Sequence, residues 1–426
     1  MTNINLKLKP RTDRDEAGPL SEAKAREGAG TLALAALLMK SLTIRHSIDP
    51  QEEGASEPCV DPTRLLPDWT QEEQRTLLER PLFSYASYGR VRFHHRSVLE
   101  FLAAERLQTL IRAGMSRRAV KRLLFARTAQ GIAVVRPSLR PVAAWLSLHE
   151  PDVFKEVCQR EPEHLICLGD PSSLSIEQRE KALEAFVERN RHGTWRGHHV
   201  PRVQTQRFAD PALGPAVRRL WDSGIANGEM REFLLELAAT APLAEMSGPA
   251  VEVFMDRAAP DEERLDALRV LIALKDPRLP EVTSAVAAEP ARWSSRALRY
   301  AVIDLFPQHL FGDQLRSVLL ALKPSKATVD AITWNWPELI QSAPLPAPAA
   351  IELREMLHKL TVETASWHND AHRLMTTRPH LVPALAAACL KELSIGPPSE
   401  GWIDAAVAAV RLMSDREYDE DRPVGS

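Results

Sequence analysis

Apolar residues recur every three to four positions along most of this chain, which is the spacing of amphipathic helices. The pattern predicts one long helix over 21–44, whose apolar run at 31–39 indicates deep packing against its neighbours. Further helices are predicted to start at two capping-box patterns, in which a Ser or Thr is followed three residues later by Glu or Gln. These patterns are Thr70 with Glu73 and Ser175 with Gln178.

The segment 82–93 predicts the one hairpin of the chain, because two short runs of β-prone residues flank Gly89. It leads directly into an apolar spacing over 94–114 that predicts another helix. Helix, hairpin and helix together indicate a winged-helix domain that, with the helical segment before it, occupies 21–114.

Paired helices repeat beyond residue 225 with a step of about 32 residues. First helices are predicted to start near Glu229, Asp261, Arg292 and Ser325, and second helices near Ser247, Leu279 and Gly312. Such a period predicts an α-solenoid of the HEAT or armadillo type over 225–413, with Leu235, Leu268 and Leu298 buried on successive first helices. The alternative is an irregular helical bundle whose spacing is accidental.

The composition supports an all-α fold. Hydrophobic residues make up 44% and charged residues 26%, whereas the chain has only 4 Tyr and 11 Phe. A large β-sandwich, a membrane bundle and a disulfide scaffold are therefore disfavoured, and the 32 prolines are expected to separate many short helices. The remaining segments are predicted as a disordered N-terminus (1–20), a helical connector with basic stretches (115–224) and a charged tail (414–426).

The sequence also predicts a cytoplasmic protein without a membrane segment. Its four cysteines lie mostly far apart, as expected in a reducing compartment. The polar N-terminus has no apolar signal core, and the apolar run at 31–39 is far shorter than the roughly 20 residues of a membrane span.

A net charge of −3 conceals an uneven distribution of charge. Nine basic residues and no acidic ones lie between Arg106 and His149, and a second stretch without acids covers 189–207. Such clusters bind the acidic surface of the same chain, an acidic protein partner or nucleic acid. The candidate partner-binding residues are Arg117, Arg118, Lys121, Arg122, Arg191, Trp195, Arg196 and Arg202.

The segment 93–104 reads FHHRSVLEFLAA. It resembles the F-x-H-[KR]-[ST]-x-x-E-[FY]-x-A-A pattern of the winged-helix domain of NACHT-type STAND NTPases, and the preceding 21–80 is similar to the helical segment before that domain. The resemblance covers roughly residues 20–190. The matching residues are Phe93, His95, Arg96, Ser97, Glu100, Phe101, Ala103 and Ala104.

The resemblance implies that His95 contacts a nucleotide phosphate when an NTPase core is present. This sequence contains no G-x-x-x-x-G-K-[ST] phosphate loop, and Gly28-Ala29-Gly30-Thr31 lacks both the Lys and the spacing. The chain is therefore expected to bind no cofactor by itself. It looks like the C-terminal half of such a protein, as a split system, a truncated gene or a misannotated start would produce, and its expected partner is a protein or an NTPase domain supplied in trans.

No residue pattern indicates catalysis or a metal site. Cys158, His164 and Cys167 offer only three of the four ligands that zinc requires, and they fall among apolar helical positions. The three histidines of the second basic stretch have no carboxylate nearby, and neither G-x-S-x-G nor H-E-x-x-H occurs.

These observations predict a non-enzymatic protein, the sensor and regulatory half of a STAND-type signalling or anti-phage defence switch. The first alternative is a nucleic-acid-binding protein that uses the winged helix and the basic stretches. A helical-repeat DNA glycosylase is the other alternative, although no catalytic carboxylate can be identified for it.

Overall fold

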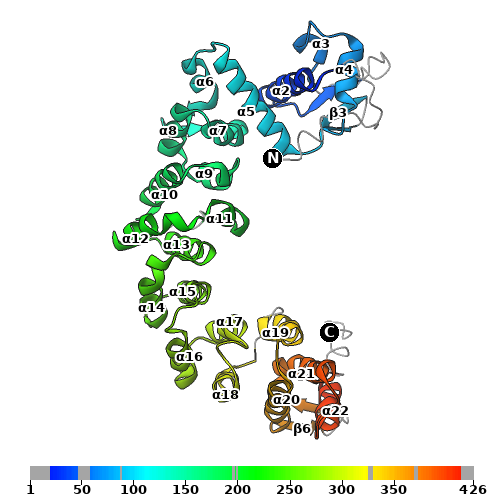
Figure 1. Cartoon of the computed structure of the whole chain (residues 1–426), viewed down its shortest axis with the longest axis vertical. Helices are drawn as coiled ribbons and strands as arrows, with labels where there is room; N and C mark the ends of the chain where they lie inside the picture. Colours follow the sequence, from blue (N-terminus) through cyan, green and yellow to red (C-terminus); the bar gives the residue numbers. More distant parts are fainter. Residues whose placement is uncertain are drawn as a thin grey trace, which may run out of the picture. The chain divides into compact units, whose positions relative to one another are not determined.

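Helices make up most of the described part of the protein in the computed structural model, and the same residues include three small antiparallel sheets (Figure 1). This agrees with the expected all-α class. The chain divides into two compact units, 1–230 and 231–426. The structure describes residues 20–46, 58–86, 89–193, 197, 200–324, 330–368 and 373–413. The predicted disordered N-terminus and charged tail lie almost wholly outside these residues.

The first helix of the N-terminal unit is shorter than the sequence predicts. Helix α2 (Glu22–Met39) begins after Ser21, whose hydroxyl accepts a hydrogen bond from the Lys24 backbone N–H. It ends where Lys40 adopts a left-handed backbone with φ of 55°. The predicted extension to residue 44 is wrong because Thr43–Arg45 forms strand β1, which buries Ile44.

Strand β1 belongs to a three-stranded sheet with the order β1-β3-β2. The predicted hairpin is confirmed as β2 (Phe83–Tyr85) and β3 (Arg90–Phe93). Helices α3 (Pro62–Leu65) and α4 (Gln71–Leu78) lie between β1 and β2 in the chain. Both predicted capping boxes are present, the first at the start of α4 and the second at the start of α10.

Helix α5 (Arg96–Arg112) follows β3 and packs along α2. Glycine at two positions of α2 makes room for its neighbours, Gly28 for the Trp69 ring and Gly30 for α5. A Cβ atom on Gly28 would lie 2.5 Å from the Trp69 ring, and one on Gly30 would lie 3.3 Å from the Leu102 carbonyl oxygen. The Gly28-Ala29-Gly30 sequence therefore serves helix packing.

The rest of the N-terminal unit is helical except for a second hairpin. This hairpin of β4 and β5 contradicts the expectation of one hairpin in the chain, and its three-residue strands are too short to show a period in the sequence. The elements are α6 (Arg117–Leu124), β4 (Phe125–Arg127), β5 (Ala133–Val135), α7 (Arg140–Ser147), α8 (Pro151–Arg160), α9 (Glu163–Cys167), α10 (Ile176–Asn190), α11 (Arg202–Phe208) and α12 (Gly214–Asp222).

Helix α13 (Gly228–Thr240) crosses the boundary between the two units. A third hairpin, β6 with β7, also went unpredicted. The remaining elements are α14 (Ser247–Met255), α15 (Asp261–Leu274), α16 (Leu279–Ala288), α17 (Ser295–Leu305), α18 (Gly312–Ala321), α19 (Ala331–Ser342), α20 (Ala347–Val362), β6 (Ala365–His368), β7 (Arg373–Thr376), α21 (Val382–Ile395) and α22 (Trp402–Met413).

The three predicted starts of second helices are confirmed at Ser247, Leu279 and Gly312. The first helix predicted near Arg292 starts later, at Ser295, and the described part of α19 starts at Ala331, each directly after a capping residue. Ser294 caps α17 by accepting from the Ala297 N–H, and Asp330 caps α19 by accepting from the Ile332 N–H. Residues 325–329, at the predicted start near Ser325, lie outside the described part of the chain.

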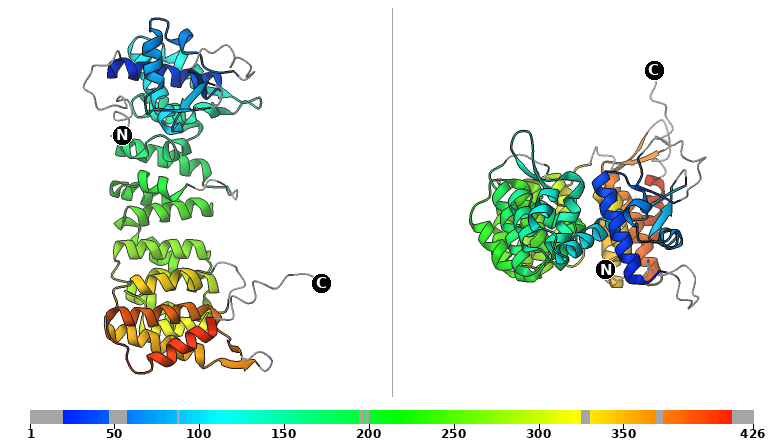
Figure 2. Two further views of the ribbon diagram at one scale, coloured as in Figure 1. Left: turned by 90° about the vertical axis from the view of Figure 1, so that its right-hand side faces the viewer. Right: turned by 90° about the horizontal axis from the view of Figure 1, so that it is seen from above.

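The helices of the C-terminal unit form two series, and the members of each series stack one on the next (Figure 2). Helix α15 packs on α17, α17 on α19 and α19 on α21, while α16 packs on α18 and α18 on α20. Leu235, Leu268 and Leu298 are buried on α13, α15 and α17 as expected. The apolar side of each first helix is thus buried against the next first helix along the chain.

Ion pairs join the successive first helices. Arg231 of α13 lies 2.7 Å from Glu263 of α15, and Arg269 of α15 lies 3.1 Å from Asp304 of α17. Arg299 of α17 lies 3.0 Å from Asp330, the residue that caps α19. The arginine comes from the earlier helix in these three pairs, which we call the ladder, whereas Arg296 of α17 pairs in the opposite direction with Glu262 of α15 at 2.7 Å.

No helix within the described residues is both long and apolar enough to cross a membrane.

Candidate functional site

The histidine singled out by the family resemblance lies at the start of a long helix. His95 occupies the N-cap position of the 17-residue helix α5, directly after β3, and its side chain is exposed. Its ring meets the His94 ring edge-on, with 4.3 Å between the ring centroids. The N-terminus of a helix attracts anions through its backbone N–H groups and its dipole. This position is therefore suited to a phosphate group.

Most other residues of the resembling segment have structural roles. Phe93, Ala103 and Ala104 are buried in the unit. Arg96 donates to Glu100 at 2.9 Å, although burial raises the pKa of this carboxyl above its ordinary value. The apolar part of the segment thus builds the fold and leaves the start of α5 at the surface.

The neighbouring helix α4 presents an acidic surface. Glu72 and Glu79 are exposed, and Arg75 is neutralised by Glu79, with 2.8 Å between Nε and Oε1. Glu73 forms an ion pair with Lys24, and hydrogen bonds from Lys24 and the Thr70 backbone lower the pKa of its carboxyl. Glu72 is therefore the carboxylate of this surface without an ion pair to a described residue, and its charge would repel a phosphate backbone.

The four predicted basic residues of 117–122 lie together on helix α6, but their side chains divide into two groups. Arg117 lies 3.6 Å from Glu150, and Lys121 lies 3.4 Å from Glu156 of α8. Arg118 and Arg122 are exposed, and no described carboxylate lies within ion-pair distance of either. One side of α6 is thus fixed to α8, while the other is available to a partner.

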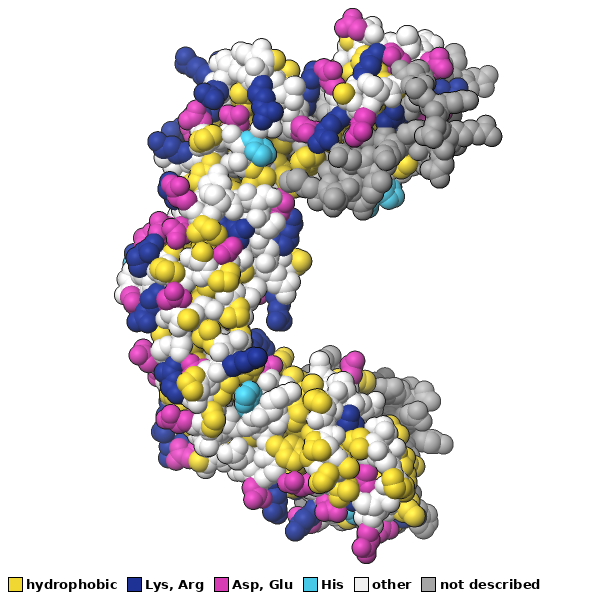
Figure 3. Space-filling model, viewed as in Figure 1, with side chains coloured by type: hydrophobic (Ala, Val, Ile, Leu, Met, Phe, Trp, Pro, Cys, Tyr) yellow, Lys and Arg dark blue, Asp and Glu magenta, His cyan; other side chains and the backbone are white. Residues whose placement is uncertain are grey.

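Further exposed basic residues surround α6. Over 106–161 the chain has eleven basic residues against four acidic ones. We define the basic face as the exposed members that have no ion pair to a described carboxylate. They are Arg112, Arg118, Arg122, Arg127, Arg136 and Lys155. Figure 3 shows Lys and Arg side chains gathered over α6 and α8.

The second basic stretch, 189–207, differs from the first because its Arg191 is used for contacts within the chain. Arg191 binds Glu188 at 2.8 Å and donates to the carbonyl oxygens of Ser223 and Gly224 at 2.6 and 3.0 Å. It therefore ties the end of α10 to the end of α12. Arg202 is exposed at the start of α11. Trp195 and Arg196, like His198 and His199, lie outside the described residues.

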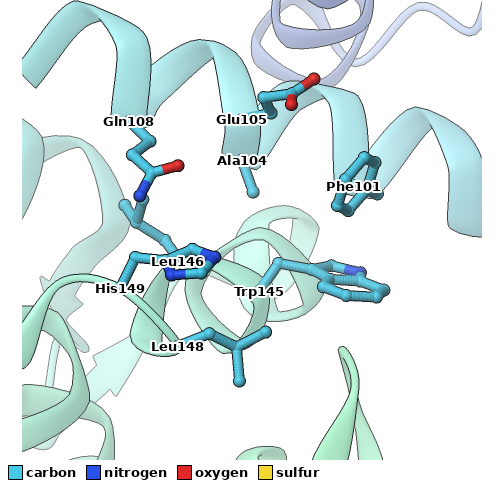
Figure 4. Close-up of a pocket in the computed structure, with 8 residues that line it drawn as sticks. All are labelled: Phe101, Ala104, Glu105, Gln108, Trp145, Leu146, Leu148 and His149. Carbon is cyan, nitrogen blue, oxygen red and sulfur yellow. The ribbon is translucent and has the colours of Figure 1, made fainter. Parts of the chain in front are cut away.

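A small pocket lies between α5 and α7 (Figure 4). The rings of Phe101 and Trp145 meet edge-on in its wall, with centroids 5.0 Å apart. Glu105 at the rim is held by Arg26 through two hydrogen bonds of 2.8 and 2.7 Å. The cavity volume of about 60 Å³ is far below the several hundred Å³ of a nucleotide pocket. No pattern in the sequence indicated this pocket.

The cysteines and His164 have properties of packing residues. Burial raises the pKa of Cys158 to about 12 and that of Cys167 to about 11, so both thiols stay protonated. Burial also lowers the pKa of His164. Glu161, Glu163 and His164 converge within 4.8 Å, but Glu161 already accepts hydrogen bonds of 2.6 Å from Arg140 and from the Val135 N–H.

Comparisons with known protein families, with characterised proteins and with solved structures find no match to this chain.

Proposed function

We propose that this chain is a non-enzymatic interaction protein, built from a winged helix and an α-solenoid, that acts as the sensor and regulatory half of a STAND-type switch. The observation that carries the proposal is the order of elements α2-β1-α3-α4-β2-β3-α5 around a sheet with the strand order β1-β3-β2. In a winged helix, three helices precede a hairpin whose second strand pairs with the strand after the first helix.

The packing of the C-terminal unit supports the solenoid part of the proposal. Its helices form two series in which each member packs on the next, and the ladder of arginine and carboxylate pairs joins successive first helices. In a solenoid each repeat contacts only its neighbours, and the stacked repeats provide an extended surface for binding proteins. We assign the recognition of a ligand or protein to this unit.

The winged helix would provide the contact with an NTPase domain. His95 is exposed at the start of α5, where the N–H groups and the dipole favour a phosphate, as the family resemblance implies. The nucleotide and its phosphate loop would come from a domain supplied in trans. Signalling or anti-phage defence in the cytoplasm is the biological setting that follows from this resemblance.

The test searches the DNA beside this gene for a P-loop NTPase and co-purifies that NTPase with the chain in Mg·ADP and in Mg·ATP. We expect a complex whose affinity depends on the nucleotide and falls at least about tenfold with His95→Ala. His94→Ala is the matched control, because this neighbouring histidine is also exposed but precedes the N-cap. The absence of such an NTPase, or equal effects of the two substitutions, would contradict the proposal.

Nucleic-acid binding is the second candidate, and the exposed arginines of the basic face favour it. The acidic surface of α4 opposes it, because this helix takes the position of the helix that enters the major groove in DNA-binding relatives of this motif. We therefore assign the basic face to an acidic protein surface.

A further inference from the structure

The pocket between α5 and α7 has the size of a single aliphatic side chain. A cavity that encloses a benzene ring has a volume of about 150 Å³, whereas this pocket measures about 60 Å³. Its walls are largely apolar, because the Phe101 and Trp145 rings line it together with Ala104 and Leu148 (Figure 4). A leucine or a methionine fits these dimensions, and a thioether sulfur also makes favourable contacts with aromatic rings.

Glu105, the carboxylate at the rim of the pocket, is already neutralised. Its two oxygens accept hydrogen bonds of 2.8 and 2.7 Å from the Arg26 guanidinium. Aromatic rings beside an unpaired carboxylate would attract an ammonium group. Here the carboxylate is paired, so the pocket favours an uncharged apolar side chain over the side chain of a lysine.

Polar groups at one end of the pocket are available to a partner. Figure 4 shows Gln108 and His149 at this end, away from Phe101 and Trp145. His149 is exposed and Gln108 is half-buried, and neither side chain forms a hydrogen bond with a described residue. The Gln108 amide and the His149 ring each offer an N–H donor. This end of the pocket can therefore bind carbonyl or carboxylate oxygens.

The same end of the pocket adjoins the basic face. Arg112 follows Gln108 by about one turn of α5, and it is exposed without an ion pair to a described carboxylate. At the start of α6, Arg117 lies 3.6 Å from Glu150, which directly follows the pocket residues after α7. Arg118, the next residue of α6, belongs to the basic face. An apolar pocket thus lies beside a positively charged surface.

We propose that this pocket binds a leucine or methionine from an acidic segment of a partner protein, whose carboxylates lie on the basic face. The apolar side chain packs on the Phe101 and Trp145 rings, Gln108 donates to the segment, and Arg112 and Arg118 pair with its carboxylates. An apolar anchor buried within a polar rim is the arrangement that concentrates binding energy in protein interfaces. This inference rests on the proposed function, in which the basic face binds an acidic protein surface.

Fluorescence anisotropy with labelled peptides of about nine residues tests this proposal on the full chain at about 150 mM salt. One peptide has a central leucine with Asp and Glu on both sides, and the others have alanine or tryptophan at the centre. We expect a Kd below about 100 µM for the leucine peptide. The alanine peptide should bind at least about tenfold more weakly because it loses buried apolar groups, and tryptophan should not restore binding because its ring is too large.

Gln108→Glu tests the pocket from the side of the protein. The new carboxylate at the rim should weaken binding of the leucine peptide at least about fivefold, because it repels the acidic segment. Gln206→Glu is the matched control, since Gln206 is an exposed glutamine on α11, and it should leave the affinity unchanged. Circular dichroism melting confirms that each variant is folded.

The possible failures separate this inference from the proposed function. Equal affinity for the leucine and alanine peptides, or equal effects of the two substitutions, would overturn the role of the pocket and leave the basic face to an acidic partner. A chain that binds none of the peptides at about 1 mM would also overturn the inference. If that chain bound a labelled DNA duplex instead, the assignment of the basic face to a protein would be wrong as well.

Discussion

Gly28, which belongs to the Gly28-Ala29-Gly30-Thr31 string that lacks the Lys and the spacing of a phosphate loop, has a packing role. Alanine is favoured over glycine in a helix by about 1 kcal/mol. Here, however, the added Cβ would lie 2.5 Å from the rigid Trp69 ring, and overpacking of this kind costs about 1–3 kcal/mol. We therefore expect Gly28→Ala to lower the free energy of unfolding, measured by urea denaturation.

Gly248→Ala is the control for this prediction. Gly248 lies in α14, and a Cβ atom there would meet no atom within 4 Å. This substitution should leave stability unchanged or raise it by up to about 1 kcal/mol. If Gly28→Ala were equally harmless, the close contact between α2 and Trp69 would be wrong.

Asp266 on α15 predicts a pH dependence of stability. Burial raises the pKa of its carboxyl to about 6 from an ordinary value of 3.8, despite Arg269 at 2.9 Å. The folded state then keeps a proton between about pH 4 and 6 that the unfolded state has lost, so this group lowers stability as pH rises through that range. Above about pH 6 the full cost of the buried charge is present.

Asp266→Asn removes this cost, because the amide carries no charge. The variant should be more stable than the wild type by on the order of 2 kcal/mol at pH 7.5, and the difference should shrink toward zero near pH 4. Urea unfolding of both proteins at several pH values measures it. A difference that does not change with pH would show that the carboxyl titrates normally.

At the scale of elements, helix α6 depends on α8. Arg117→Glu with Lys121→Glu removes the ion pairs to Glu150 and Glu156 and replaces them with repulsion. Exposed pairs contribute about 0.2–1 kcal/mol each, so we expect a loss of on the order of 1–2 kcal/mol and a lower Tm by calorimetry. Arg118→Glu with Arg122→Glu is the matched control and should change stability by less than about 0.5 kcal/mol.

The sequence predicted elements where local chemistry determines them. The caps at Thr70 and Ser175, and the starts of the second helices, follow from side chains next to them in the chain. Strands β1, β4 and β5 went unpredicted because three residues show no period, and they form only through pairing with distant residues.

The same distinction applies to the candidate site, where local features were predicted and contacts between distant residues were not. The like-charge spacing on α6 was visible in the sequence, and His95 lies at the helix start that its motif predicted. The acids that neutralise Arg117 and Lys121 were not identified, because Glu150 and Glu156 approach α6 only through the packing of α8.

For the whole molecule, the account predicts that the isolated chain does not bind ATP. The sequence has no phosphate loop, and His95 alone provides neither a nest of backbone amides nor a magnesium ligand. Calorimetric titration with Mg·ATP should show no heat of binding at micromolar protein. Micromolar binding abolished by a point substitution in this chain would disprove the prediction.

The central claim is that the protein binds proteins and not nucleic acid, and fluorescence anisotropy with a labelled DNA duplex tests it most directly. The wild type and the folded Arg118→Glu/Arg122→Glu variant are compared at about 50 and 200 mM salt. The account predicts a dissociation constant above about 1 µM at the higher salt, with little difference between the two proteins. Tight binding that falls steeply with salt and vanishes in the variant would contradict the claim and assign the basic face to nucleic acid.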